Sequence, residues 1–234
     1  MLEPREYTIA EIGSQLGTTT RQGIKRKLER YEVSFRITGR GENTIFTINE
    51  IKNEFKLFCI IELNFSAETD FYKLQYFLYY FFNDDDFRAM PDERKAVWID
   101  GNNHHVSRPT IASYTQKLQR ENMILRDSGN YTYYFALKEH QRFVAKEEYS
   151  QAWREYWANR EAGADSCEAI ATMIADYGGV ARKQAIPEIN GIYNKEIEYM
   201  LSLIQKNIEK EHDEKIKSTI WHFHNIYITV NRLT

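Results

Sequence analysis

The stretch of residues 106–118 carries the clearest helical signal in the chain. Ser107 can accept hydrogen bonds from the first free amides of a helix. Pro109 is tolerated in the first turn, because the N–H that it lacks would have no partner there. Apolar residues recur at helical spacing and predict a buried face: Ile111, Tyr114 and Leu118. The other face is polar and basic, with Arg108, Thr110, Ser113, Lys117 and Arg120. The pattern therefore predicts a helix that packs on one side only.

Strand-like sequence follows this helix. Residues 124–126 precede a break at 127–130, and the aromatic run 131–137 has the composition of a strand. We expect these segments to form a hairpin. A helix followed by such a hairpin resembles the winged helix-turn-helix proteins, and the resemblance covers about residues 92–145. It implies that the polar face of the helix enters the major groove of DNA. Residues 95–101 fit the preceding helix or a short strand.

The first segment, residues 1–64, predicts a second helix-turn-helix unit. Residues 8–11 (Thr-Ile-Ala-Glu) form a capping box, and the helix that they open ends at Gly17. A turn of three threonines then leads into a second helix with Ile24, Leu28 and Tyr31 on one side. The rest of that helix is basic, with Arg21, Lys25, Arg26, Lys27 and Arg30.

A hairpin with an arginine at its tip follows. Residues 33–37 alternate with period two, 38–43 are turn-like, and 44–48 are strand-like again. Arg40 at the tip can reach phosphates or a minor groove, where a guanidinium is favoured. From residue 21 to residue 40, seven basic residues face two acidic ones, while the rest of the chain is acidic. A second capping box, 47–50, predicts a helix that continues through Ile51, Phe55 and Phe58.

Residues 70–82 are apolar almost all round a helix, which predicts a buried core helix or, alternatively, a surface for self-association as a homodimer. From residue 146 the pattern becomes helical, with helices expected at 146–157 and 166–174. A further helix would begin at Pro187 and continue as an amphipathic tail over 197–208. Residues 219–230 favour a strand by composition.

Composition is that of an ordinary globular chain. Of 234 residues, 42% are hydrophobic and 28% charged, so a buried core is expected. There is no apolar run long enough for a membrane span and no signal-peptide pattern, and we expect a cytoplasmic protein with no membrane partner. Cys59 and Cys167 lie far apart and predict buried or inert thiols in a reducing compartment. The net charge of −3 excludes a uniformly basic surface, but not a local basic face.

Three clusters could carry metal chemistry, and each has a simpler interpretation. Residues 84–86 are three aspartates in an expected loop, and His104 and His105 lie in the turn before the second predicted DNA-facing helix. His222 and His224 would lie on one side of the expected C-terminal strand. The sequence has no glycine-rich phosphate loop, no nucleophile elbow and no CxxC pair. We therefore expect no enzyme activity and no cofactor.

These patterns predict a mainly α protein with small β-hairpin wings, in the α+β class. Three segments are expected: a helix-turn-helix unit with a wing (1–64), a winged-helix unit (65–148) and a helical module for packing or oligomerisation (149–234). The expected function is sequence-preferring binding of double-stranded DNA as a transcriptional regulator. The expected DNA contacts are Arg21, Lys25, Arg26, Lys27, Arg40, Arg108, Thr110, Ser113 and Lys117. The alternative is a mobile-element or phage protein that binds a protein partner, as an inhibitor of a host defence complex or a replication accessory factor.

Overall fold

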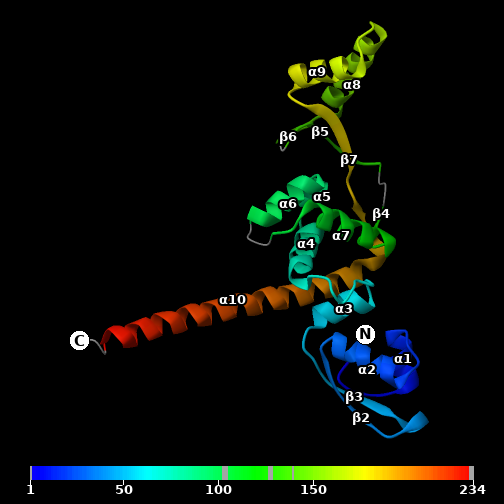
Figure 1. The fold of residues 1–234 in the computed structure, drawn as a ribbon, viewed down its shortest axis with the longest axis vertical. Coiled ribbons are helices and arrows are strands. Elements are labelled where there is room, and N and C mark those ends of the chain that lie inside the picture. The colour runs from blue at the N-terminus through cyan, green and yellow to red at the C-terminus, as the bar shows by residue number, and fades with distance from the viewer. Residues whose placement is uncertain (1, 102–104, 126–128, 139, 232–234) are drawn as a thin grey trace. The chain divides into compact units, whose positions relative to one another are not determined.

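The computed structural model describes residues 2–101, 105–125, 129–138 and 140–231, with side chains as far as residue 215. The chain is mainly helical and has small antiparallel sheets, which confirms the α+β class (Figure 1). Two compact units divide it: unit 1 comprises Met1–Tyr79 and Gly191–Thr234, and unit 2 comprises Tyr80–Asn190.

Unit 1 begins with two helices and a three-stranded sheet. In chain order these are β1 (Glu6–Thr8), α1 (Ile9–Leu16), α2 (Arg21–Arg30), β2 (Val33–Thr38) and β3 (Ile45–Ile51). The sheet has the order β1-β3-β2 and is antiparallel, with Phe46 of β3 opposite both Tyr7 and Ile37. One core joins the helices to the sheet and includes Tyr7, Ile12, Ile24, Leu28 and Phe46. The two helices and the hairpin expected here are confirmed, and β1 is an additional strand.

The helix expected to start at the capping-box pattern of residues 47–50 is wrong. Those residues lie within β3, and α3 (Glu54–Ile61) begins after Asn53, whose side chain accepts from the Lys56 amide at 2.8 Å. Pairing of β3 with strands on both sides satisfies more backbone groups than one local cap could. Tertiary pairing therefore overrides the local signal.

The aromatic helix α4 (Phe71–Asn83) is buried by the chain itself. Leu74, Phe77, Leu78 and Phe81 have no exposed surface, which confirms the interpretation as a core helix. In unit 1, the Tyr76 hydroxyl of α4 donates to Glu211 Oε2 of α10 (Asn194–Asn231) at 2.8 Å.

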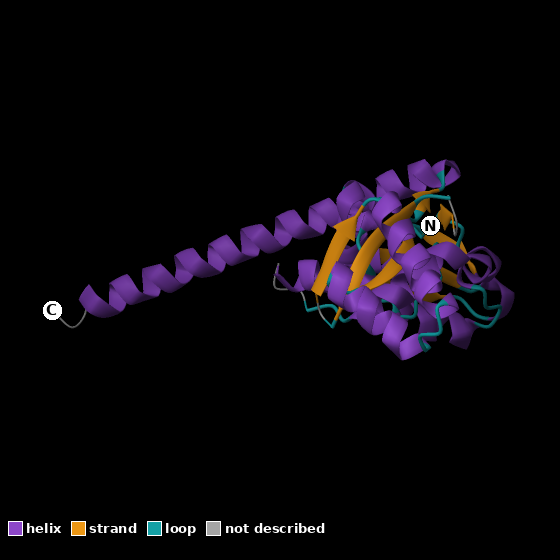
Figure 2. Cartoon of the chain, turned by 90° about the horizontal axis from the view of Figure 1, so that it is seen from above, coloured by secondary structure: helices purple, strands orange, loops and turns teal. Residues whose placement is uncertain are grey.

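Helix α10 corrects two predictions. It is one continuous helix and includes residues 219–230, so the strand expected there is wrong (Figure 2). Strand propensity is a weak preference, and extending an existing helix requires no new nucleus. The helix also begins at Asn194, after the 3-10 turn η2 (Gly191–Tyr193), and not at Pro187.

Unit 2 opens with three helices: α5 (Asp85–Ala89), α6 (Asp92–Gly101) and α7 (Arg108–Arg120). Residues 95–101 are therefore helical. Helix α7 has Ser107 as its N-cap and buries Ile111, Tyr114 and Leu118, as predicted.

The strands of unit 2 pair differently from the expected hairpin. Strand β4 (Ile124–Leu125) pairs with β8 (Glu188–Ile189), whereas β5 (Tyr131–Leu137) lies between β6 (His140–Val144) and β7 (Val180–Ala185). The hairpin of 124–126 with 131–137 is therefore wrong, although 131–137 is a strand. Partners such as β7 are distant in sequence, so local patterns do not reveal them.

Helices α8 (Lys146–Glu161) and α9 (Ser166–Tyr177) pack on the β6-β5-β7 sheet. The core between them contains Phe135, Ala152, Met173 and Ala181. The C-terminal segment is thus not all helical, because β7 and β8 belong to it. The two compact units also differ from the three consecutive segments expected, since residues from 191 onward group with the N-terminal part of the chain.

Candidate nucleic-acid interface

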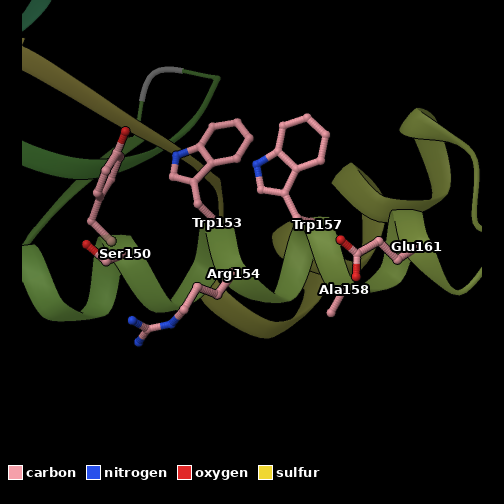
Figure 3. A pocket seen from close by; sticks show the side chains of 7 residues that line it. Ser150, Trp153, Arg154, Trp157, Ala158 and Glu161 are labelled. Atoms are coloured by element: carbon pink, nitrogen blue, oxygen red, sulfur yellow. The ribbon is translucent and has the colours of Figure 1, made fainter.

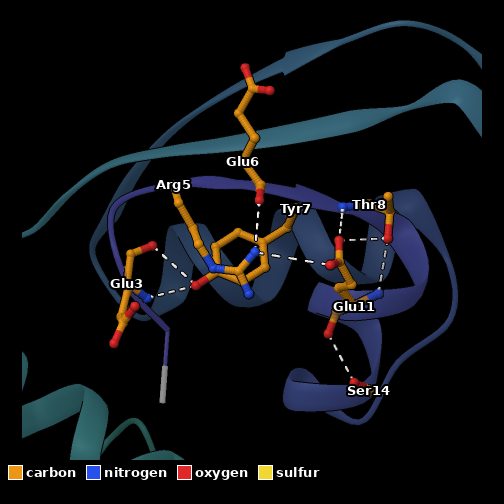
Figure 4. Close-up of polar contacts among 7 residues, drawn as sticks. All are labelled: Glu3, Arg5, Glu6, Tyr7, Thr8, Glu11 and Ser14. Carbon is orange, nitrogen blue, oxygen red and sulfur yellow. Dashed lines mark hydrogen bonds and ion pairs between the residues drawn. The ribbon is translucent and has the colours of Figure 1, made fainter.

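The start of α1 is fixed by the predicted capping box (Figure 4). The Thr8 hydroxyl accepts from the Glu11 amide at 3.3 Å, and Glu11 Oε2 accepts from the Thr8 amide at 2.7 Å. The Thr8 hydroxyl also donates to Glu11 Oε2 at 2.9 Å. The pKa of Glu11 is lowered below its ordinary value, first by the bond that the carboxylate accepts from the Thr8 amide and then by the bond from the Thr8 hydroxyl. Helix α1 therefore begins at a defined residue.

A tight turn joins α1 to α2. Gly17 ends α1 in the left-handed conformation, and the Thr18 amide donates to the Gly13 carbonyl at 3.0 Å. A Cβ atom on Gly13 would lie only 2.5 Å from the Thr18 carbonyl oxygen, so the turn folds directly against α1 at this glycine. Thr20 then caps α2 by accepting from the Gly23 amide at 3.1 Å. The backbone contact at Gly13 sets the approach of α2.

Helix α2 presents cations to solvent. Its apolar residues Ile24 and Leu28 are fully buried, while Arg21, Lys25 and Arg26 are exposed. Within the described part of the chain, Arg21 and Arg26 form no ion pair. Lys25 pairs with Glu29 of the next turn at 3.6 Å, but both side chains are about half exposed, and such pairs contribute little.

Two other basic residues of α2 have partners inside unit 1. The ammonium group of the part-buried Lys27 donates a hydrogen bond to the Leu16 carbonyl at the end of α1. It thereby satisfies one of the free carbonyls of that helix end, and its place is structural. Arg30 forms an ion pair with Glu68. Neither pairing was evident from the sequence, because both partners lie outside α2.

The β2–β3 hairpin carries Arg40 at its tip, as predicted. The tip contains the 3-10 turn η1 (Gly41–Asn43), and the exposed Arg40 precedes it directly. No ion pair to Arg40 exists among the described residues. Arg21, Arg26 and Arg40 thus form a set of exposed, uncompensated guanidinium groups within one compact unit, hereafter the arginine set.

The predicted contact residues of α7 are mostly engaged within unit 2. Arg108 pairs with Glu93 at 2.9 Å, and Lys117 pairs with Glu121 at 3.0 Å. The hydroxyls of Thr110 and Ser107 hydrogen-bond at 2.8 Å as part of the cap. Ser113 is exposed. The basic character that the sequence indicates for α7 is largely neutralised by neighbouring carboxylates.

The candidate metal clusters have other local roles or lie outside the described residues. Asp84 caps α5 by accepting from the Phe87 amide at 3.0 Å, and Asp85 pairs with Arg88. His105 pairs with Asp100, whereas His104 and the side chains of His222 and His224 are not described. The last two belong to a helix, so the expected strand geometry for them is wrong. Among described residues, no group of three or more potential ligands could hold a metal ion.

The two cysteines differ from each other. Cys59 is buried, and burial raises the pKa of its thiol well above the ordinary value. Cys167 is exposed, so of the two thiols expected to be buried or inert, burial is confirmed for Cys59.

An aromatic surface lies on α8 of unit 2. Figure 3 shows Trp153 and Trp157 projecting from the same side of this helix, with Arg154 and Ala158 on another side. An open depression of about 480 Å³ lies beside them, and Trp157 is 57% exposed. The Trp153 indole Nε1 is buried and has no hydrogen-bond partner among the described residues. The helical pattern of residues 146–157 does not reveal the exposure of Trp157.

Comparison of the chain with protein-family models, with curated proteins and with solved structures finds no match. Within the described residues, every helix is too short or too polar to cross a lipid bilayer.

Substituting Gly13→Ala should destabilise unit 1 by about 1–3 kcal/mol, because the new methyl group would overlap the Thr18 carbonyl. Urea unfolding followed by circular dichroism measures the change. Gly101→Ala in α6 is the matched control, since a Cβ atom there meets nothing within 4 Å. Equal midpoints for the two variants would contradict the close approach.

The capping box should make stability depend on pH in a defined direction. Because the folded-state pKa of Glu11 is lowered from 4.5, its contribution is present above that value and is lost as pH falls through the folded pKa. The difference in unfolding free energy between the wild type and Glu11→Gln should therefore shrink between pH 7 and about pH 3. Urea titrations at several pH values test this. A difference that stays constant with pH would mean that the carboxylate makes no charge-dependent bond.

Proposed function

We propose that the protein binds double-stranded DNA through unit 1, as a regulator with sequence preference. The observation that carries this proposal is the arginine set: three exposed guanidinium groups, on α2 and at the hairpin tip of one compact unit, with no carboxylate partner among the described residues. Uncompensated guanidinium groups on one small unit create a local positive potential that attracts a polyanion.

The local fold suits this role. A helix that buries Ile24 and Leu28 and exposes cations on its outer side can enter a major groove, where arginine pairs with guanine in a bidentate manner. Arg40 at the hairpin tip could contact phosphates or an adjacent minor groove. The chain order β1-α1-α2-β2-β3, with β3 central in the sheet, supports the resemblance of unit 1 to winged helix-turn-helix proteins.

Helix α7 of unit 2 has a lesser part in this proposal. Its two predicted cations already pair with Glu93 and Glu121, and breaking such pairs to reach phosphates would reduce the gain from binding. The acidic balance outside residues 21–40 also disfavours DNA contact over the whole surface. The proposal therefore confines the principal contact to unit 1.

The direct test is fluorescence anisotropy of the full chain with duplex DNA over a salt series. One duplex has random sequence, and the other comes from upstream of the protein's own gene, because regulators frequently control themselves. Binding with a steep salt dependence, and tighter on the upstream duplex, is expected. Absence of binding to either duplex at low salt would overturn the proposal.

Replacing Arg21 or Arg26 by Gln should lower the slope of log K against log salt by about 0.9 for each phosphate that the variant no longer neutralises. If the side chain reads a base instead, affinity should fall mainly for the preferred duplex. The matched control is Arg154→Gln, which removes one exposed charge from α8. An unchanged slope and unchanged preference in both α2 variants would place α2 away from the DNA.

A second candidate function, binding of a protein partner, is favoured by the aromatic surface of α8. Exposed tryptophan beside a depression is typical of the residues that dominate protein interfaces. In this alternative, the helix-turn-helix elements act as a scaffold.

The two sides of α8 allow an internal comparison. A photo-reactive p-benzoylphenylalanine at position 157 should crosslink to one defined protein in the native host, and the same residue at position 151, which is exposed but does not line the depression, should not. Sedimentation of the purified chain identifies the case in which that protein is a second copy. Equal crosslinking from both positions would mean that α8 has no specific partner surface.

A further inference from the structure

Unit 2 contains a cavity of about 630 Å³ that neither proposed function uses. Its walls come from the first turns of α6, the start of α7, and residues of β5, β6 and β7. The volume lies within the range of about 300–1,000 Å³ that small-molecule sites occupy. The residues that decide its chemistry are polar or charged.

The two carboxylates of the cavity already have partners. Glu93 pairs with Arg108 at 2.9 Å, and Asp92 pairs with the buried Lys95 at 3.5 Å. Three further cations line the same cavity: Arg94, Lys138 and Arg182. Among the described residues, none of these three has a carboxylate partner. The cavity therefore has an excess of positive charge that the described residues do not compensate.

Two polar groups in the cavity have no hydrogen-bond partner within the part of the chain that the structure describes. The Tyr134 ring is largely buried, with 7% of the residue exposed, and no described residue bonds to its hydroxyl, which stays open to solvent in the cavity. Gln141 Oε1 is buried and also has no partner. Buried polar atoms are normally satisfied, so the open Gln141 acceptor needs a partner, and the Tyr134 hydroxyl beside it is a donor that a ligand can reach.

The surroundings of Tyr134 agree with this arrangement. Burial raises the pKa of its hydroxyl, and Glu93, Arg182 and Arg108 also act on it electrostatically. The hydroxyl thus stays protonated at neutral pH and lies among the charged groups of the cavity. It can donate to an anion that the cations attract.

We propose that this cavity binds a small organic dianion that also carries a hydrogen-bond donor, the chemistry of a hydroxylated phosphate monoester or hydroxy-dicarboxylate. The anionic group would lie among Arg94, Lys138 and Arg182, and two guanidinium groups can each bind a phosphate or carboxylate in a bidentate manner. The Tyr134 hydroxyl would donate to the same group, and Gln141 Oε1 would accept from a ligand hydroxyl. The proposal does not depend on DNA binding.

The test is a chemical-shift titration of the ¹⁵N-labelled full chain at constant ionic strength. The probes are glycerol 3-phosphate, malate and glycerol. Saturable shifts near the cavity with either anion, and none with glycerol, are expected. A stronger response to glycerol 3-phosphate identifies a phosphate as the natural group, and a stronger response to malate identifies a carboxylate. Shifts that rise without saturation, or equal binding of glycerol, would overturn the proposal.

Variants on β7 provide the matched comparison. Arg182→Gln should weaken binding by about tenfold, because it removes a charge-assisted hydrogen bond. Lys183→Gln removes the same charge from the next residue, which does not line the cavity and lies over the Tyr131 ring at 4.5 Å. Its affinity should stay at the wild-type value. Equal weakening by both variants would indicate a diffuse charge effect and overturn the site.

Tyr134→Phe keeps the buried ring and removes only the hydroxyl. We expect weaker binding of the anion with unchanged thermal stability, because the hydroxyl has no described partner in the free protein. Unchanged affinity in this variant would overturn the role assigned to the Tyr134 hydroxyl.

Discussion

Burial of Ile24 and Leu28 is the constraint on which the proposed DNA-binding surface of unit 1 depends. These two side chains are fully enclosed, so the rotation of α2 about its axis is fixed by the core. The backbone contact between Gly13 and Thr18 holds the preceding turn against α1. The rotation of α2 about its axis and the position of the preceding turn against α1 are both fixed, and Arg26 therefore faces solvent.

The proposed roles of the two units follow from where charges find partners. In unit 1, Lys27 and Arg30 are used internally, and the arginine set remains uncompensated. In unit 2, Arg108 and Lys117 of α7 are paired, while three cations around a cavity have no described carboxylate partner. Charge that the fold does not compensate is available for a ligand: an extended polyanion on an open helix and hairpin, and a compact anion in a cavity.

Sequence reasoning succeeded where structure is determined locally. N-cap residues and apolar spacing located α1, α2 and α7, since a helix start depends on residues within one turn. It failed where distant strands compete for the backbone. The capping pattern at Thr47 lies inside β3, and β5 pairs with β7 about fifty residues later. The pairing of β3 with its neighbours and the pairing of β5 with β7 leave no signal in the local sequence pattern.

The same limit applies to the candidate sites. Exposure of Arg21, Arg26 and Arg40 could be predicted, because each follows from its position opposite an apolar face or at a turn. The partners of Lys27, Arg108 and Lys117 could not, because they depend on which carbonyl or carboxylate the fold brings close. The cavity combines Tyr134, Gln141 and Arg182 from three strands, whose register no local pattern contains. A hydroxyl and an amide oxygen without partners become meaningful only after every other polar group around them has been accounted for.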